Sequence, residues 1–346
     1  MINSKKVFVT GGAGYIGSVL SGILLEAGYE VILYDCFFFN ESSIKNISQH
    51  PSLTVVKGDV QDTATVASLL EKGMDVIHLA SLSNDPSCDM DPKWSLKINH
   101  EATVNLAIAA KEKGCRRFVY ASSCSVYGFG GEEILTETSL CNPVSLYADL
   151  KLRSEESIMK MADKSFCPVL LRQATIFGLS PRMRFDLAIN QMTMHAITRG
   201  KIFVMGGGEQ WRPFLHVRDS ARLFKACLEA PREDVFSQVF NAGSDENNFQ
   251  IVELAELVSR ELEDIEVVVA PDDTDRRSYN VDFSKIKRVL GFTPKENISN
   301  SISEIADYIK DHPSADFNSS EYFNVKRLQE ITSHFNVLQG YTPVKD

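Results

Sequence analysis

The chain has 346 residues, of which 44% are hydrophobic and 24% are charged, and its formal net charge at pH 7 is −10. This is an ordinary globular composition, long enough for one large and one smaller domain, and the acidic balance argues against partners such as nucleic acid or an anionic membrane. The seven cysteines are scattered without a CxxC pair, and no apolar run approaches the ~20 residues of a membrane helix, so we expect a reduced, cytoplasmic protein without a metal site.

Short apolar runs alternate with helical patterns over the first 172 residues. The helical pattern that follows the first run covers 17–27 and ends at Gly28. Continuous β-branched and apolar runs are typical of strands buried on both faces of a parallel sheet, and strands alternating with helices predict an α/β fold with a doubly wound parallel (Rossmann) sheet. The predicted strands are 6–10, 30–35, 53–59, 75–80, 117–122 and 168–172.

The pattern changes after Arg172. Residues 178–213 carry glycines and prolines and are predicted to be irregular; a further sheet strand is expected at 238–243, a helix at 251–262 and a strand at 265–270. The C-terminal tail, from about residue 312, could form either a helix that packs against the rest of the protein or a frayed end. We therefore predict a Rossmann domain and a smaller, discontinuous α/β lobe, divided as 1–172 plus about 214–243, 173–213 plus about 244–312, and a C-terminal tail over 313–346.

A glycine-rich loop separates the first predicted strand from the first helix. In TGGAGYIGS, residues 10–18, the glycines Gly11, Gly14 and Gly17 are three apart, and Tyr15 and Ile16 lie between the last two. Glycines here permit a tight turn and a close approach of the backbone to a pyrophosphate, which the helix N-terminus attracts. A turn without a ligand is the alternative, but the strand–loop–helix context favours a dinucleotide site.

Two acidic residues follow the next two strands. Asp35 ends the second strand, 18 residues after Gly17, close to the spacing expected of a carboxylate that binds ribose hydroxyls. A carboxylate there would repel a 2′-phosphate, so NAD is favoured over NADP. Asp59, after the third strand, fits either a contact near the adenine or a carboxylate in an ordinary turn.

A Tyr-x-x-x-Lys motif at Tyr147 and Lys151 puts both side chains on one face of a helix. An ammonium group beside a phenol favours the phenolate, so we expect a lowered pKa for Tyr147 and a role as a base. Ser123 follows the fifth strand, at the sheet edge where such folds bind ligands, and its hydroxyl could steady the reacting oxygen or simply satisfy the backbone.

Taken together, these motifs resemble the NAD-dependent epimerase/dehydratase family of extended short-chain dehydrogenases/reductases, over nearly the whole chain to about residue 310. The resemblance rests on the glycine loop, Asp35, Asn99, the YxxxK motif and the segments at 58–60, 78–80, 122–128, 171–172 and 212–219. It implies that NAD oxidises a hydroxyl on a nucleotide-linked sugar.

The resemblance also implies residue roles. The catalytic residues would be Ser123, Tyr147 and Lys151. NAD would be bound by Gly11, Gly14, Tyr15, Ile16, Gly17, Asp35, Asp59, Val60, Leu79, Ala80, Asn99, Tyr147 and Lys151. The nucleotide sugar would contact Ser83, Asn84, Ser123, Thr175, Arg182, Arg184, Arg212 and Arg277, with the last two arginines gripping the diphosphate. Arg182 and Arg184 could equally belong to a basic surface loop.

Departures from the family pattern narrow the expected reaction. Where 4,6-dehydratases carry an Asp-Glu pair, this chain has Cys124 and Ser125. We therefore expect a 4-epimerase of bacterial surface-polysaccharide precursors, with a 4-dehydrogenase, for example of a GDP-heptose, as the alternative. The SPRMRFDL segment at 180–187 resembles a subgroup with that activity. A dehydratase or a non-catalytic dinucleotide-binding protein fits the residues less well.

The resemblance further implies a homodimer formed through helices near 92–113 and 144–162. These segments have enough apolar surface for that contact, but the same side chains could simply cover the sheet.

Overall fold

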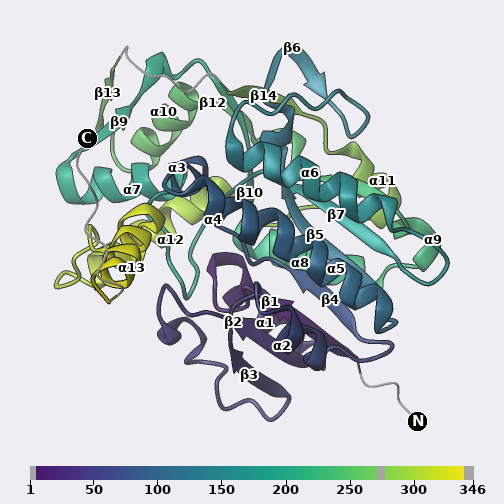
Figure 1. The fold of residues 1–346 in the computed structure, drawn as a ribbon. Helices are drawn as coiled ribbons and strands as arrows, with labels where there is room; N and C mark the ends of the chain where they lie inside the picture. The colour runs from purple at the N-terminus through teal and green to yellow at the C-terminus, as the bar shows by residue number, and fades with distance from the viewer. Residues whose placement is uncertain (1–4, 271–276, 339–346) are drawn as a thin grey trace.

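The computed structural model describes residues 5–270 and 277–338 (Figure 1). Its centre is a seven-stranded, entirely parallel sheet with the strand order β11-β7-β5-β4-β1-β2-β3, which confirms the predicted doubly wound α/β fold. The strands of this sheet are β1 (Lys6–Thr10), β2 (Glu30–Asp35), β3 (Leu53–Lys57), β4 (Asp75–His78), β5 (Arg117–Ser123), β7 (Pro168–Gln173) and β11 (Gln238–Ala242).

Alternate side chains of each central strand enter two different cores. In β1, Val7 and Val9 face one layer of helices and Phe8 faces the other, and all three are fully buried. This is why the strands are apolar along their whole length. The first layer contains α1 (Tyr15–Glu26) and α8 (Val217–Glu229), and the second contains α2 (Thr63–Leu69), α5 (Thr103–Glu112) and α6 (Leu146–Lys160).

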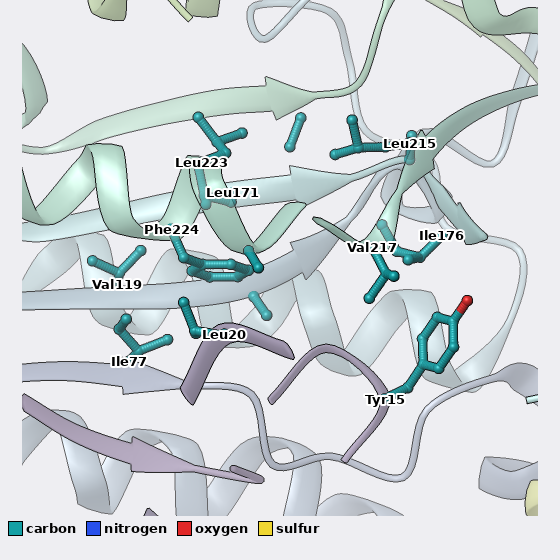
Figure 2. Close-up of a cluster of buried hydrophobic side chains, with 14 of the residues drawn as sticks. Tyr15, Leu20, Ile77, Val119, Leu171, Ile176, Leu215, Val217, Leu223 and Phe224 are labelled. Atoms are coloured by element: carbon teal, nitrogen blue, oxygen red, sulfur yellow. The ribbon is translucent and has the colours of Figure 1, made fainter. Parts of the chain in front are cut away.

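Figure 2 shows the first of these cores, where Leu20 of α1 and Phe224 of α8 meet Val119 and Leu171 of the sheet. These four side chains are completely buried. The shared core holds α1 against the sheet, and thereby fixes the loop that precedes α1.

Smaller sheets lie beside the carboxyl edge of the main one. β10 (Trp211–His216) pairs with β8 (Thr175–Phe177) and β12 (Asn248–Gln250), and β9 (Lys201–Val204) pairs with β13 (Glu266–Val269). They share a third core with α7 (Ala188–Arg199), α10 (Ile251–Glu261) and α12 (Ile298–Asp311). The division of the chain into domains at the predicted residues stays a prediction.

The prediction that residues 178–213 are irregular was wrong. They contain α7, β9 and the start of β10. Ile189, Met192 and Ala196 recur at helical spacing and are buried in the third core, so tertiary packing stabilises a helix between glycine- and proline-rich turns. Gly200, with φ +65°, ends that helix.

The remaining helices and strands lie around the sheets already described. The helical run from Pro92 to Glu112 is continuous: α4 and α5 are joined by a π-helical segment at Lys97–Ala102. The tail contains a helix, α13, whose Leu328 is buried, as in the docking alternative. These elements are α3 (Asp85–Asp89), α4 (Pro92–Leu96), β6 (Phe129–Leu135), α9 (Arg232–Val235), β14 (Ser278–Val281), α11 (Ser284–Leu290) and α13 (Asn324–Leu338). Among the helices so described, none is both long and apolar enough to cross a membrane.

A buried ion pair fixes α6 to the sheet. The Arg172 guanidinium of β7 donates to both oxygens of Glu155 on α6, with Nη2 2.8 Å from Oε2, and the Ser122 hydroxyl of β5 donates to the same carboxylate. Arg172 Nη1 also donates to the Tyr127 hydroxyl at 3.0 Å. The carboxylate is thus fully partnered, which is the condition under which a buried charge is tolerated.

Replacing Glu155 with alanine should destabilise the protein by about 3–5 kcal/mol, because it leaves the Arg172 guanidinium buried without its counter-charge. Urea denaturation followed by circular dichroism measures this. Glu156→Ala, at the exposed neighbouring position on α6, is the control and should change stability by less than about 0.5 kcal/mol. Equal effects of the two substitutions would contradict the anchoring role.

Candidate active site

A cavity of about 320 Å³ lies at the carboxyl ends of β1, β2, β4 and β5, within the range of small-molecule sites. Parallel α/β sheets bind ligands at this edge. Most of the predicted site residues line it: Gly11, Gly14, Tyr15, Ile16, Gly17, Asp35, Asp59, Val60, Leu79, Ala80, Ser83, Asn84, Ser123, Tyr147, Lys151, Thr175, Arg182, Arg184 and Arg277.

The glycine loop is packed so closely that side chains are excluded. A Cβ on Gly17 would lie 2.1 Å from the Gly11 carbonyl oxygen, and one on Gly11, where φ is +70°, would lie 2.7 Å from the Ala80 nitrogen. The turn is closed by a 3.1 Å hydrogen bond from the Gly14 N–H to the Gly11 oxygen. The loop therefore presents backbone directly to the cavity at the start of α1, where the helix dipole favours a phosphate.

Asp35 lines the cavity at the end of β2, next to the glycine loop. Its carboxylate accepts hydrogen bonds from the Ala13 N–H at 3.0 Å and the Phe37 N–H at 2.8 Å, which join the glycine loop to the chain after β2. Burial raises the pKa of Asp35. Asp59 accepts from the Gln61 backbone and side-chain amides at 2.8 and 3.0 Å, so it closes a turn and also lines the cavity.

Tyr147 and Lys151 lie one turn apart on α6 and face Ser123 at the end of β5. The Lys151 ammonium donates to the Ala121 carbonyl at 2.8 Å and lies 5.7 Å from the centre of the Tyr147 ring. The Ser123 oxygen accepts a hydrogen bond from the Ser125 hydroxyl at 2.9 Å, so its own proton is free to be donated into the cavity. The structure brings these three side chains together at the cavity, and their catalytic roles stay a prediction.

The expected lowering of the Tyr147 pKa is wrong for the protein without ligands. Burial raises the pKa of Tyr147, and a hydrogen bond with Ser123 opposes this only in part. Burial also lowers the pKa of Lys151 to about 8. Removal of water disfavours both charged forms, and at this separation the attraction between them does not compensate.

Arg184 lines the same cavity as Tyr147. Its guanidinium binds Asp186 through two hydrogen bonds of 2.8 and 3.0 Å and lies 3.4 Å from the Ser83 hydroxyl. Asn84, at φ +124°, caps α3 through a 2.9 Å bond from the Ser87 N–H and donates to Asp186 at 3.3 Å. These hydrogen bonds hold the polar groups in place in the cavity wall. Arg182 and Arg184 are both buried, so the alternative of a basic surface loop is wrong.

Two predicted residues do not line the cavity. Asn99 is buried against the lining residue Leu82, where its side-chain amide accepts from the Leu82 N–H at 2.8 Å and donates to the Leu82 carbonyl at 3.0 Å. Arg212 lies 5.1 Å from the centre of the Tyr279 ring and donates to the carbonyl of Arg277. Arg277 itself lines the cavity and forms an ion pair with Asp85. Direct ligand contact by Asn99 and Arg212 stays a prediction.

Several residues that line the cavity were not predicted from the sequence. Residues 36–40, CFFFN, form a wall beside Asp35, and the three phenylalanines in a row were a signal for an apolar contact surface. Cys36 in this wall has its pKa raised to about 12 by burial. Gln173 and Tyr279 also line the cavity, as do Asn324 and Leu328 of α13, which no local motif indicated.

All seven cysteines lie in the described residues and are free thiols there. In the same part of the chain, no group of three or more histidine, cysteine, aspartate or glutamate side chains could hold a metal ion.

Comparison with known proteins places this geometry in a family. The NAD dependent epimerase/dehydratase family matches residues 7–243, which is more than half of the chain. The chain belongs to this family. The family's cofactor, NAD, confirms the predicted cofactor, and the side-chain-free glycine loop and the Asp35 carboxylate fit its pyrophosphate and ribose.

Several similar proteins are named for sugars linked to UDP. An uncharacterized UDP-glucose epimerase of Bacillus subtilis strain 168, YtcB, is 29% identical over 88% of this chain and 98% of its own. UDP-glucuronic acid decarboxylase 1 of Xenopus tropicalis is 28% identical over 88% and 72%. The structure of UDP-N-acetylglucosamine 4-epimerase from Methanobrevibacter ruminantium M1, with UDP-N-acetylmuramic acid, is 26% identical with a TM-score of 0.81, over 90% and 100%.

Replacing Lys151 with methionine should stabilise the protein without ligands at pH 7 by about 2 kcal/mol. The lowered pKa of Lys151 corresponds to about 3 kcal/mol, and the lost bond to Ala121 offsets about 1 kcal/mol. Between pH 8 and 10.5 the unfolded chain binds more protons at Lys151 than the folded protein does. The free energy of unfolding of the unsubstituted protein therefore rises with pH through this window relative to that of the variant.

The difference between the two proteins should therefore shrink as the pH is raised from 8 to 10. Urea titrations of both at pH 7, 8, 9 and 10 measure it. A variant that is less stable than the unsubstituted protein at every pH would show that the ammonium group stabilises the fold.

Proposed function

We propose that this protein is an NAD-dependent 4-epimerase of a nucleoside-diphosphate sugar. The observation that carries the proposal is that Ser123, Tyr147 and Lys151 converge on the same cavity as the glycine loop and Asp35. Relatives that act on UDP-linked sugars support it, and they make UDP-sugars the first substrates to test.

NAD supplies the hydride acceptor for oxidation at C4 of the sugar. Tyr147 takes the proton from the C4 hydroxyl, and Ser123 donates a hydrogen bond to the same oxygen as its charge develops. Lys151, one turn further along α6, supplies the positive charge that stabilises the phenolate. In the return step, Tyr147 gives the proton back to the same oxygen, on a sugar that has presented its other face.

The two residues that follow Ser123 at the carboxyl end of β5 argue against a dehydration reaction. Cys124 is buried, its thiol donates to the Arg172 carbonyl, and it does not line the cavity. Ser125 lines the cavity but carries only a hydroxyl group. Elimination of water needs an acid and a base at these positions, and neither residue supplies one.

Product analysis tests the proposal. The purified protein is incubated with NAD and a panel of UDP-, GDP-, dTDP- and CDP-sugars, with absorbance recorded at 340 nm and the products identified by NMR. A C4-inverted sugar with little NADH is the expected result. A ketosugar with stoichiometric NADH would instead identify a 4-dehydrogenase, and pentose with release of carbon dioxide from a uronate would identify a decarboxylase.

Tyr147→Phe should reduce turnover by about 10²–10⁴-fold, because it removes the group that carries the proton and leaves the apolar ring in place. NAD affinity, measured by calorimetry, should be nearly unchanged. The control is Tyr322→Phe, a tyrosine in the region of Phe185 that does not line the cavity, which should leave turnover intact. Near-normal turnover of Tyr147→Phe would remove this residue from the mechanism.

A further inference from the structure

The C-terminal helix α13 forms part of the cavity wall. Asn324 and Leu328, one turn apart on its inner face, line the cavity and are 3% and 1% exposed. In Figure 1, α13 lies at the yellow end of the colour scale, far from β1 and β2 in sequence, and it packs against α3. Residues from near the end of the chain thus meet residues from its first hundred.

Asn324 joins two segments at the cavity. Its side-chain amide donates to the carbonyl and hydroxyl oxygens of Ser83, at 3.0 and 3.1 Å, and its oxygen accepts from Arg182 Nη2 at 2.5 Å. Its backbone N–H donates to Asp186 at 3.2 Å. Every polar group of this buried side chain is therefore used to hold the residues after β4 against the residues after β8.

The hydrogen bond from Arg182 to Asn324 holds the Arg182 side chain on the side of the cavity that contains Asp35. Its guanidinium lies 3.9 Å from the centre of the Phe39 ring, in the wall that follows Asp35. Arg182 is 4% exposed, and its Nε–H has no hydrogen-bond partner among the described residues. A buried donor without a partner is costly, so this group is set up to bind an oxygen that a ligand brings.

The same helix holds the wall directly. Arg327 Nε donates to the Phe38 carbonyl at 2.6 Å. Leu328 is buried in the apolar cluster that includes Phe38 and Trp94, whose rings are 6.0 Å apart. One helix therefore fixes residues 36–40 by a hydrogen bond and by packing, and fixes Arg182 through Asn324.

We propose that α13 completes the cofactor site, holding residues 36–40 and Arg182 around the adenosine half of NAD and slowing its release. The adenosine half is the part concerned because Asp35, which immediately precedes this wall, is the residue expected to bind its ribose. The free Nε–H of Arg182 donates to a ribose or phosphate oxygen there. Slow release would keep the cofactor bound through a complete oxidation and reduction of the sugar, and this benefit rests on the proposed epimerase function.

The decisive experiment measures release of NADH in the absence of any sugar. The protein is loaded with NADH, mixed in a stopped-flow instrument with excess NAD, and the loss of bound-NADH fluorescence gives the dissociation rate. Arg327→Ala should accelerate dissociation about tenfold or more, because residues 36–40 lose their bond to α13. Gln329→Ala, on the exposed side of the same helix, is the matched control and should release NADH at the unsubstituted rate.

Asn324→Ala separates a role in the cofactor site from a role in folding. Its melting temperature is recorded with and without saturating NADH, since a ligand raises that temperature according to its affinity for the folded state. A smaller NADH-induced rise and faster release than in the unsubstituted protein are expected. Unchanged release in both Arg327→Ala and Asn324→Ala, with an unchanged NADH-induced rise, would overturn the proposal. Neither measurement depends on the sugar, so failure of the proposed epimerase activity would be seen separately.

Discussion

The contact between Gly17 and the Gly11 carbonyl is the constraint on which the site depends. Because no side chain separates them, α1 begins directly against the loop after β1, and its first backbone groups face the cavity. The helix is held there by packing of Leu20 against α8 and the sheet, so apolar burial on one side fixes the position of polar backbone on the other. A methyl group on Gly17 would push α1 away from the glycine loop, and one on Gly11 would collide with the backbone at Ala80.

In the helix α6, too, a buried contact at one end positions a residue that lines the cavity. Tyr147, Lys151 and Glu155 follow one another at intervals of four residues on one face, so they form a line from the cavity into the protein interior. Tyr147 lines the cavity, Lys151 is buried behind it, and Glu155 is held by its ion pair with Arg172. The ion pair of Glu155 with Arg172 fixes the rotation of α6 about its axis. This rotation in turn determines the direction in which the Tyr147 side chain points.

The sequence was sufficient for those parts of the molecule that depend on local pattern. The strands of the main sheet, the glycine loop, Asp35 and the Tyr147–Lys151 pair follow from periodicity and spacing within a few residues. The helix α7 was missed because its apolar stripe lies between glycine and proline signals that suggested a loop. The contribution of Asn324 and Leu328 could not be predicted, since it depends on where a distant helix docks. The pKa of Tyr147 was misjudged because spacing indicates neighbours but does not reveal how completely burial removes water.

One further consequence follows from Cys36, which lies in the cavity wall between Asp35 and the three phenylalanines. Peroxides and alkylating agents react with the thiolate, and a thiol whose pKa is about 12 is almost wholly protonated at neutral pH. Burial, together with the nearby Asp35 carboxylate, therefore disfavours the reactive thiolate form of this sulfur. A thiol can thus line the cavity next to Asp35 and remain in its less reactive, protonated form.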